Sequence, residues 1–351
     1  MRLDELFTPE EIALYWTKVV EARQPYMGEA FFAPQKKAGL DLSWFKGADN
    51  LPISLMPSAF DAKATFRDRP GFAKTETEMP FFREGFKIKE RDRQMLLELS
   101  NSESAYAQDI IRRIFDDAVN LIDGANVVAE RMRMALLFPD SGNVQIIFKA
   151  NGVNYTYNYD PQGTWKASNY KPLSGSKLWS ASATADPFKD INERKKAIRS
   201  KTGAEVQYLA MNSVTAEALY ACDAVKNRFL TSSGLALAYL TDDEAKRAVE
   251  QTVKMTILIN DKMYKDESGT AHNFVPDGYV AFLPAGGVGN TYYGTTPEEA
   301  DLGSKAIVVN TGVTITTILD EHPVNLNTFA SEIVLPTYER MDDVAVLKVL
   351  A

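Results

Sequence analysis

The clearest signal in the pattern of apolar and polar positions is one long helix. Between Ser104 and Phe138, apolar residues recur at spacings of three and four and form a single stripe. At 1.5 Å per residue, about 35 residues would span about 50 Å, which is longer than most helices of globular proteins. Pro139 predicts the end of this helix, and Gly124 predicts a bend. No heptad code of charges accompanies the stripe, so we interpret it as a strut and not as a coiled coil.

Shorter elements are predicted before and after the strut. Thr8-Pro9-Glu10-Glu11 combines an N-cap, a proline at the first helical position and acids in the first turn, which predicts a helix up to about Arg23. Repeated glycines and prolines predict that residues 28–58 form an extended arm. Asn143–Tyr159 is predicted to be a hairpin, because Asn151-Gly152 is typical of a type I′ turn between two alternating runs.

A compact α/β region is predicted from residue 186 onward, after a Ser/Gly/Trp-rich connection over residues 160–185. Its predicted helices run from Asp186-Pro187 to about Lys201, over Val214–Asn227 after the cap Asn212-Ser213, and from Thr241 to about Gln251. Its predicted strands are Glu205–Met211, Met255–Asn260 and the central Tyr279–Leu283. Later β-rich runs at 306–309, 313–319, 329–336 and 344–349 predict a return to a sheet beside the long helix. The fold class expected from this order is α+β.

Ala59–Arg93 is the most unusual segment of the chain. It places nine basic residues, seven acidic residues and six phenylalanines in 35 positions. Two half-alternating runs, Lys63–Arg67 and Phe86–Lys89, flank Arg69-Pro70-Gly71, which suits a type II turn. A lone two-stranded ribbon is marginally stable in water. The pattern leaves two interpretations open: an arm that packs on a neighbouring subunit, or an irregular surface excursion.

Composition excludes several classes of protein. The chain has 351 residues, enough for two or three domains, and a net charge of −8, which argues against broad nucleic-acid binding. No apolar run approaches the roughly 20 residues of a membrane helix. The first residues include acids and no cationic segment, so no secretory signal is expected. Cys222 is the only cysteine, which excludes an intramolecular disulfide and indicates a reducing compartment.

Although the chain is acidic overall, one short segment is rich in basic residues: Lys189, Arg194, Lys195, Lys196, Arg199 and Lys201. We interpret it as the solvated face of a helix, with a small basic patch for binding as the alternative.

The residue types and their spacings predict no catalytic, cofactor or metal site. The two histidines, His272 and His322, lack zinc spacing, and Cys222 is expected to be a buried structural thiol. Ala285–Asn290 is glycine-rich but lacks the Lys-Ser/Thr of a P-loop, so a flexible loop is expected. Asp261, Asp266 and Glu267 lack the spacing of a calcium loop, and a hairpin turn is predicted there.

A family resemblance is carried by residues spread over nearly the whole chain. The most recognisable stretch is Asn273-Phe274-Val275-Pro276-Asp277-Gly278, which leads into a strand and a glycine-bearing loop. Further matching stretches are Ala59–Arg69, Glu76–Glu84, Tyr279–Leu283, Ala285–Asn290, Tyr292-Tyr293-Gly294, Ile333–Leu335 and Val344–Leu350. Together with the order of elements, they make the chain resemble the shell subunit of tailed bacteriophages, and more narrowly the phage major capsid protein E family of lambda-type head proteins.

The resemblance implies a Hong Kong 97-like capsid fold. It implies an N-terminal helix and arm (1–58), an extended loop (59–100), a peripheral domain with the spine helix and hairpin (101–160), an axial domain with its connections (161–305) and C-terminal strands that return to the peripheral domain (306–351). No long scaffolding segment has a counterpart ahead of Leu3, so a separate scaffolding protein is expected.

The function implied by the resemblance is a major capsid protein that self-assembles into hexamers and pentamers of an icosahedral shell. The shell would assemble in the host bacterial cytoplasm, become part of the virion and enclose packaged DNA without sequence-specific binding. Expected partners are further copies of the chain, a portal and a decoration protein. Neither a membrane nor a cofactor is expected.

Candidate contact residues between subunits lie in the charged segment: Phe66, Arg67, Asp68, Arg69, Phe72, Phe81, Arg83 and Glu84. Exposed ion pairs stabilise by only ~0–1 kcal/mol each, so strength is expected from many contacts and from buried aromatic rings. Two other interpretations stay open on the residues alone. One is an encapsulin-like compartment that holds cargo enzymes, and the other is a soluble α+β enzyme or ligand-binding protein.

Overall fold

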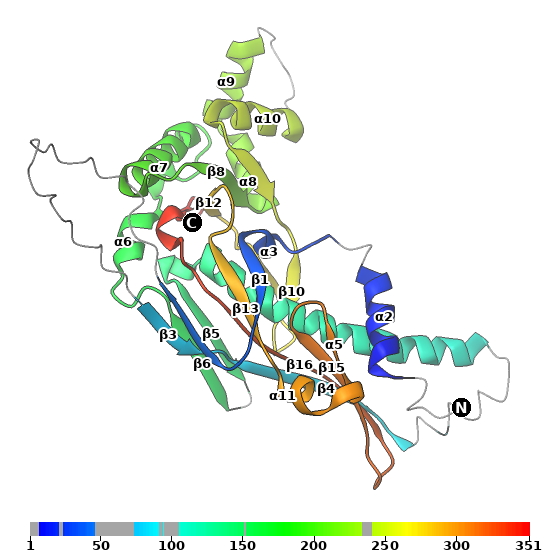
Figure 1. The fold of residues 1–351 in the computed structure, drawn as a ribbon. Coiled ribbons are helices and arrows are strands. Elements are labelled where there is room, and N and C mark those ends of the chain that lie inside the picture. The colour runs from blue at the N-terminus through cyan, green and yellow to red at the C-terminus, as the bar shows by residue number, and fades with distance from the viewer. Residues whose placement is uncertain are drawn as a thin grey trace, which may run out of the picture. The chain divides into compact units, whose positions relative to one another are not determined.

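The computed structural model describes residues 7–20, 24–45, 74–90, 94, 105–150, 152–233 and 241–351 (Figure 1). The chain divides into two compact units, each with its own sheet. The first unit takes its residues from Met1–Leu42, Glu76–Arg133 and Asn290–Thr337. The second takes them from Ser43–Thr75, Met134–Gly289 and Tyr338–Ala351. Each unit is therefore assembled from segments that lie far apart in the sequence.

The predicted strut is present as helix α5, Ala105–Leu137. Its apolar stripe is buried, as Ala118, Ile122, Ala129 and Met132 illustrate. Pro139 follows the helix, as expected, because its ring prevents the helix from continuing. The helix is unbroken at Gly124, where an added Cβ would meet no other atom of the protein.

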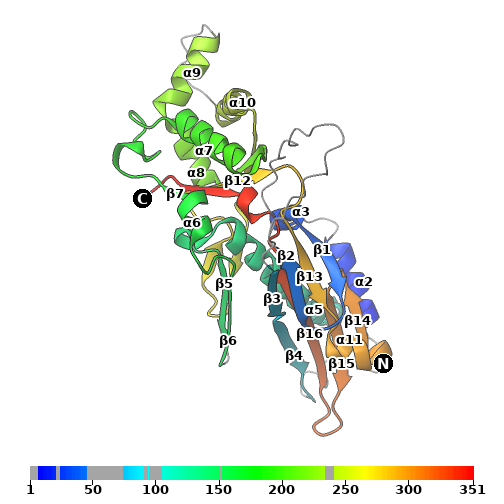
Figure 2. The ribbon, with the colours of Figure 1, turned by 60° about the vertical axis from the view of Figure 1, so that its left-hand side comes forward.

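The sheet of the first unit has the order β1-β13-β16-β15-β14, and β4 lies along β16 as well. These strands are β1 (Phe32–Lys37), β4 (Phe81–Ile88), β13 (Gly289–Gly294), β14 (Ala306–Val309), β15 (Val313–Leu319) and β16 (Leu326–Pro336). Helix α2 (Pro9–Val20) lies over β14 and β15 (Figure 2). Ile12 and Trp16 of α2 share a core with Ile122 of α5 and Ile315 of β15. Burial of such a side chain stabilises by ~1.5–3 kcal/mol.

The N-terminal region is more regular than the sequence predicts. Helix α2 starts as expected, with the Thr8 hydroxyl accepting a hydrogen bond from the Glu11 N–H at 3.2 Å. The described part of the expected extended arm contains the short helix α3 (Met27–Phe31), β1 and β2 (Asp41–Phe45), which pairs with β3 (Lys74–Glu78). The rings of Phe31 and Phe32 are buried. Because this segment places both rings in the core, it adopts regular helix and strand geometry.

The second run of the charged segment, which begins at Phe86, is supported by the sheet of its own unit. Strand β4 pairs antiparallel with β16 over eight positions, from Ile88 opposite Leu326 to Phe81 opposite Ile333. Backbone pairing with a buried strand of the same unit supplies the support that an isolated ribbon lacks. The first run, Lys63–Arg67, and the turn after it lie outside the described residues.

The sheet of the second unit has the order β7-β17-β12-β8-β9. Its strands are β7 (Tyr170–Pro172), β8 (Val206–Met211), β9 (Thr256–Ile259), β12 (Tyr279–Pro284) and β17 (Ala345–Lys348). Its main helices are α7 (Pro187–Thr202), α8 (Ser213–Ala221), α9 (Asp223–Ser233) and α10 (Asp242–Val253). Strand β12 is buried along its whole length and lies centrally, as its sequence predicts.

The last strand differs from expectation. β17 pairs with β12 and β7 in the second unit, whereas β14, β15 and β16 belong to the first. The expected return of the whole stretch 306–351 to one sheet is therefore not what the chain does. Both faces of β17 carry apolar side chains. Val346 and Leu347 point to opposite faces and are both buried, as suits an interior strand. The division of the chain into an arm, an extended loop, a peripheral domain, an axial domain and C-terminal strands stays a prediction.

The predicted helix Val214–Asn227 is two helices, α8 and α9, separated at Cys222. The Cys222 backbone is extended there, and its thiol donates to the carbonyl oxygens of Ala218 and Trp179 at 3.3 and 3.5 Å. Burial raises the pKa of this thiol to about 11. The expectation of a buried structural thiol is confirmed, although not on a continuous helix.

Two hairpins complete the second unit. β5 (Gln145–Ala150) and β6 (Val153–Asn158) form the hairpin predicted over 143–159, and β10 (Met263–Lys265) pairs with β11 (Ala271–Asn273). The connection over 160–185, left without assigned structure, contains α6 (Thr164–Asn169), β7 and a 3-10 turn, Gly175–Lys177. Its Trp165 and Trp179 are fully buried, so this connection is part of the core.

Candidate assembly surfaces

A buried polar cluster fixes the N-terminal segment of the first unit onto α5. The Arg133 guanidinium donates from Nε to the Thr291 hydroxyl at 2.9 Å and from Nη2 to the Tyr293 hydroxyl at 2.9 Å. Its Nη1 pairs with Glu130 Oε2 at 3.3 Å, and Glu130 Oε1 accepts the Gly28 N–H at 2.8 Å. Both charged side chains are at least 97% buried. Helix, strand β13 and N-terminal segment thus share one set of hydrogen bonds.

Gly28 is required for this close approach. A Cβ at this position would lie 2.7 Å from Arg133 Cβ and 2.7 Å from Glu130 Oε2. The Thr291 hydroxyl adds a second link by donating to the Phe32 carbonyl at 3.2 Å. The first described segment after α2 therefore fits directly against the helix.

A second buried carboxyl group faces the same guanidinium. Glu332 on β16 is fully buried, and neither carboxyl oxygen has a hydrogen-bond partner among the described residues. Burial raises its pKa well above 4.5, and the positive charge of Arg133 opposes this rise. Burial likewise raises the pKa of Glu130, opposed by Arg133 and the Gly28 N–H. One cation between two buried acids favours a neutral Glu332.

Three of the predicted contact residues lie on strand β4. Arg83 pairs with Glu298 of α11 (Pro297–Asp301) in the same chain, and its guanidinium lies 4.7 Å from the centre of the Phe81 ring. The side chains of Arg83 and Glu84 are exposed, and Phe81 is half-buried. Arg83 therefore already has an intramolecular partner. The role of the three residues in contacts between subunits stays a prediction.

The other predicted contact residues, Phe66, Arg67, Asp68, Arg69 and Phe72, lie outside the described residues.

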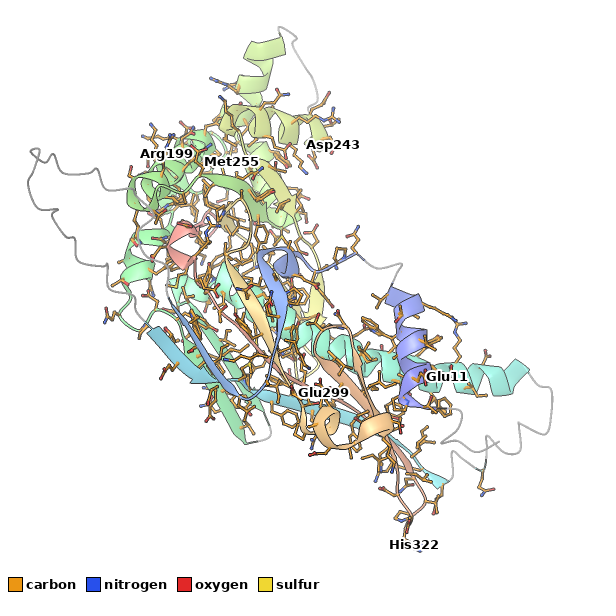
Figure 3. The ribbon with its side chains drawn as sticks, in the orientation of Figure 1. Glu11, Arg199, Asp243, Met255, Glu299 and His322 are labelled. Carbon is orange, nitrogen blue, oxygen red and sulfur yellow. The ribbon has the colours of Figure 1, made fainter. Side chains whose placement is uncertain are left out.

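Sequence reasoning missed the acidic helix α11. Its Thr296 caps the helix by accepting from the Glu299 N–H at 3.3 Å, and Glu299 pairs with Lys36 at 2.6 Å. Figure 3 places Glu299 on this short helix. The signal was available, because Thr296-Pro297-Glu298-Glu299 repeats the tetrapeptide that starts α2.

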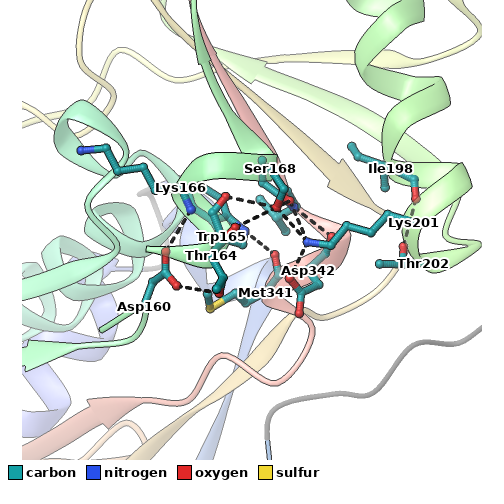
Figure 4. A network of polar contacts seen from close by, with 12 residues as sticks. Asp160, Thr164, Trp165, Lys166, Ser168, Ile198, Lys201, Thr202, Met341 and Asp342 are labelled. Carbon is teal, nitrogen blue, oxygen red and sulfur yellow. Dashed lines mark hydrogen bonds and ion pairs between the residues drawn. The ribbon is translucent and has the colours of Figure 1, made fainter. Parts of the chain in front are cut away.

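Three of the six cations in the basic run of α7 donate hydrogen bonds to groups elsewhere in the second unit. Lys201 Nζ lies within 3.0 Å of oxygen atoms of Ser168, Asn169 and Asp342 (Figure 4). Arg194 donates to the Ser168 carbonyl at 2.8 Å, and Lys195 to the Val253 carbonyl at 3.1 Å. The interpretation as a solvated face is only partly right, because these cations join α7 to α6, α10 and the C-terminal segment.

Two loops that were considered for ligand binding are held by hydrogen bonds from side chains. Arg340 donates to the carbonyl oxygens of Ala285 and Gly287 at 3.3 and 3.1 Å, which fixes the glycine-rich loop that was expected to be flexible. Asp266 accepts the backbone N–H groups of Ser268 and Thr270 at 2.9 Å each, so the predicted hairpin turn is confirmed. Hydrogen bonds from Ser268 and His272 hold the pKa of Asp266 well below its usual range.

The described ranges of the chain contain no group of three His, Cys, Asp or Glu side chains placed to hold a metal ion. The same ranges contain no helix long and apolar enough to cross a membrane.

The chain has an α+β fold similar to that of solved phage capsid proteins, the Hong Kong 97-like fold. Similar solved structures include the putative capsid protein of a prophage of E. coli CFT073 (TM-score 0.62, 12% identity, 98% and 99% of the two chains covered). A phage-related protein from Bordetella bronchiseptica RB50 has a TM-score of 0.58 at 12% identity, with 97% of each chain covered. The capsid of cyanophage A-1(L) has a TM-score of 0.51 at 11% identity, with 92% of each covered.

The family is shown by sequence. The model of the phage major capsid protein E family matches residues 17–349, and the chain belongs to this family. No curated protein sequence matches the chain. The family resemblance inferred from the residues is confirmed. Family membership favours a phage shell protein over an encapsulin-like compartment or a soluble enzyme.

Proposed function

We propose that this phage capsid protein assembles into hexamers and pentamers that close an icosahedral shell around the packaged DNA. The observation that carries the proposal is the match of the capsid protein family over residues 17–349, in a chain with the matching fold. The role is structural, without a catalytic step. A closed shell needs contacts between different surfaces of identical copies, arranged so that their rotation closes into rings.

The first unit has features that suit such contacts. Strand β4 is supported along one edge by β16 and presents Arg83, Glu84 and Lys87 to solvent. Each exposed ion pair stabilises by ~0–1 kcal/mol, so many copies of the same contact are needed for a durable shell. We assign the contacts between subunits to the charged segment, with Phe66, Arg67, Asp68, Arg69 and Phe72 acting together with Phe81, Arg83 and Glu84.

The remaining partners follow from the chemistry of a container. A net charge of −8 per chain disfavours tight binding of DNA, so the genome is enclosed without sequence-specific contacts. Assembly takes place in the host bacterial cytoplasm with a separate scaffolding protein and a portal, and a decoration protein binds the finished shell. The shell becomes part of the virion.

The direct test is electron microscopy and sedimentation of the full chain, expressed alone and together with the neighbouring phage genes. Closed shells, or free hexamers and pentamers, are expected in at least one of the two preparations. A monodisperse monomer in both would contradict the proposal. Charge reversal at Arg67 and Arg69 should abolish particles while the monomer stays folded, and an unchanged particle yield would remove these two residues from the interface.

A further inference from the structure

A cavity of about 230 Å³ lies beside strand β7 in the second unit; we call it the β7 cavity. Its lining residues are Lys171, Leu173, Asp190, Glu193, Arg194, Ala197 and Leu347. The four that belong to α7 share one face of that helix, because they recur at spacings of three and four. Lys171 of β7 lies opposite Leu347 of β17. One helix and the two strands at one edge of the sheet therefore border the cavity.

Arg194 is the unusual residue of this lining, because it is buried without a carboxylate partner. It is only 8% exposed, and its Nη1 donates to the Ser168 carbonyl at 2.8 Å. No carboxylate of the described residues lies at ion-pair distance from its guanidinium. Loss of hydration lowers the pKa of Arg194, and the negative charge of Glu193 opposes this shift. A buried cation is costly unless an anion pairs with it, so this position favours an anion from outside the chain.

The two acidic groups of the lining have other partners. Glu193 pairs with Lys171 at 3.6 Å, and these side chains are 51% and 45% exposed. Asp190 Oδ2 accepts the Trp179 indole N–H at 3.3 Å, and burial raises the pKa of Asp190. Neither acid therefore forms an ion pair with the buried guanidinium. Their presence still disfavours a multiply charged anion such as phosphate, because like charges repel at this range.

Three kinds of group in the lining define the class of ligand. Leu173, Ala197 and Leu347 form an apolar wall. The guanidinium of Arg194 suits a carboxylate, which accepts two of its N–H groups, and the carboxylate of Asp190 accepts an N–H group. A molecule with a carboxylate, an N–H group and an apolar side chain on neighbouring atoms matches all three kinds. Amino acids and the last residue of a peptide have this arrangement.

We propose that the β7 cavity binds a small apolar carboxylate of the amino-acid type, with the ligand carboxylate on Arg194, its N–H group on Asp190 and its side chain against the apolar wall. The last residue of a peptide and a free amino acid offer this same chemistry. The site goes beyond the proposed function, because every residue that lines it belongs to one unit and no second copy is needed.

The test is a ligand-observed NMR titration of the full chain with four probes. N-acetyl-leucine carries the free carboxylate and the amide N–H of a peptide's last residue. Leucine has the same carboxylate and an ammonium group in place of the amide. N-acetyl-leucinamide lacks the carboxylate, and inorganic phosphate is an anion without an apolar side chain. The four probes therefore separate the carboxylate from the apolar group and the peptide end from the free amino acid.

The expected result is saturable binding of N-acetyl-leucine or leucine, at least about tenfold tighter than binding of N-acetyl-leucinamide or phosphate, because a charged hydrogen bond is lost with either control. Tighter binding of N-acetyl-leucine would identify the end of a peptide as the source, and tighter binding of leucine would identify a free amino acid. Equal binding of the two would support a site open to both. A smaller ratio to the controls, or no binding of either carboxylate, would overturn the inference.

Variants locate the binding in the β7 cavity. Arg194→Met keeps an apolar stem but removes the cation, and it should weaken binding about tenfold or more. Arg199→Met is the matched control on the same helix, because Arg199 is 70% exposed, pairs with Glu205 and does not line the cavity; its affinity should stay unchanged. Ala197→Phe fills the cavity from an exposed helix position, so it decides the question if Arg194→Met does not fold. Unchanged affinity in Ala197→Phe, or in folded Arg194→Met, would overturn the inference.

Discussion

Charged side chains serve different purposes in the two units. In the first unit, Arg133, Glu130 and Glu332 are removed from water and lie in one cluster. In the second unit, Lys201 and Asp342 pair at 2.9 Å while their side chains stay 40% and 28% exposed. A buried cluster gains strong mutual attraction but has no water to replace a lost partner, whereas an exposed pair is easily replaced by hydration. The same residue types therefore differ in what their removal costs.

The largest effect is expected for Arg133→Ala. This change leaves Glu130 and Glu332 buried without a cation and removes hydrogen bonds to Thr291 and Tyr293. Breaking a buried pair in this way typically destabilises by about 3–5 kcal/mol. Urea denaturation of the unassembled chain measures the change, with Arg131→Ala, two positions earlier on the same helix, as the matched control. A loss below about 1 kcal/mol would contradict the assigned role of the cluster.

The next largest effect tests how closely the N-terminal segment packs against α5. Gly28→Ala places a Cβ 2.7 Å from two atoms of the cluster, and overpacking of this kind costs about 1–3 kcal/mol. Gly124→Ala is the control, because its Cβ meets open space within a helix and should stabilise by about 0.5–1 kcal/mol. Denaturant midpoints of the two variants should move in opposite directions. Equal shifts would contradict the close approach of the N-terminal segment to α5.

Glu332→Gln sharpens the comparison through pH. The folded pKa of Glu332 lies above its ordinary value of 4.5, so above pH 4.5 the folded protein holds a proton that the unfolded chain releases. Its contribution to stability is complete below that pH and is lost as the pH rises toward the folded pKa. The variant has no such proton and should gain stability over the unmodified protein, on the order of 1 kcal/mol, as the pH rises from 5 to 8. Thermal unfolding at both values measures this gain, and a constant difference would contradict a neutral buried Glu332.

The smallest effect is expected in the second unit. Lys201→Ala removes one ion pair and two hydrogen bonds at a half-exposed position, and such groups contribute about 0–1 kcal/mol. The loss should shrink further in high salt, because exposed charges are screened. Denaturation at low and high salt provides the measurement. A salt-independent loss of several kcal/mol would place this network with the buried cluster of the first unit.

Local signals in the sequence predicted most of the elements. The stripe of α5, the Thr-Pro-Glu-Glu start of α2 and the turn of the β5–β6 hairpin all depend on residues within a few positions of one another. Such patterns act through neighbours along the chain, so they can be interpreted without a fold. The break at Cys222 shows the limit, because burial of its thiol against the Trp179 carbonyl decides the backbone there.

What the sequence by itself determined is the family, the α+β class and the periodic elements, since each follows from patterns along the chain. Only the tertiary structure decided that β4 joins β16, that β17 leaves the strands before it for the second sheet, and that one arginine faces two buried acids. Glu332 looks in sequence like any strand glutamate. The Arg133 charge that it faces comes from α5, which is distant along the chain. Burial and a shifted pKa arise only when such segments pack together.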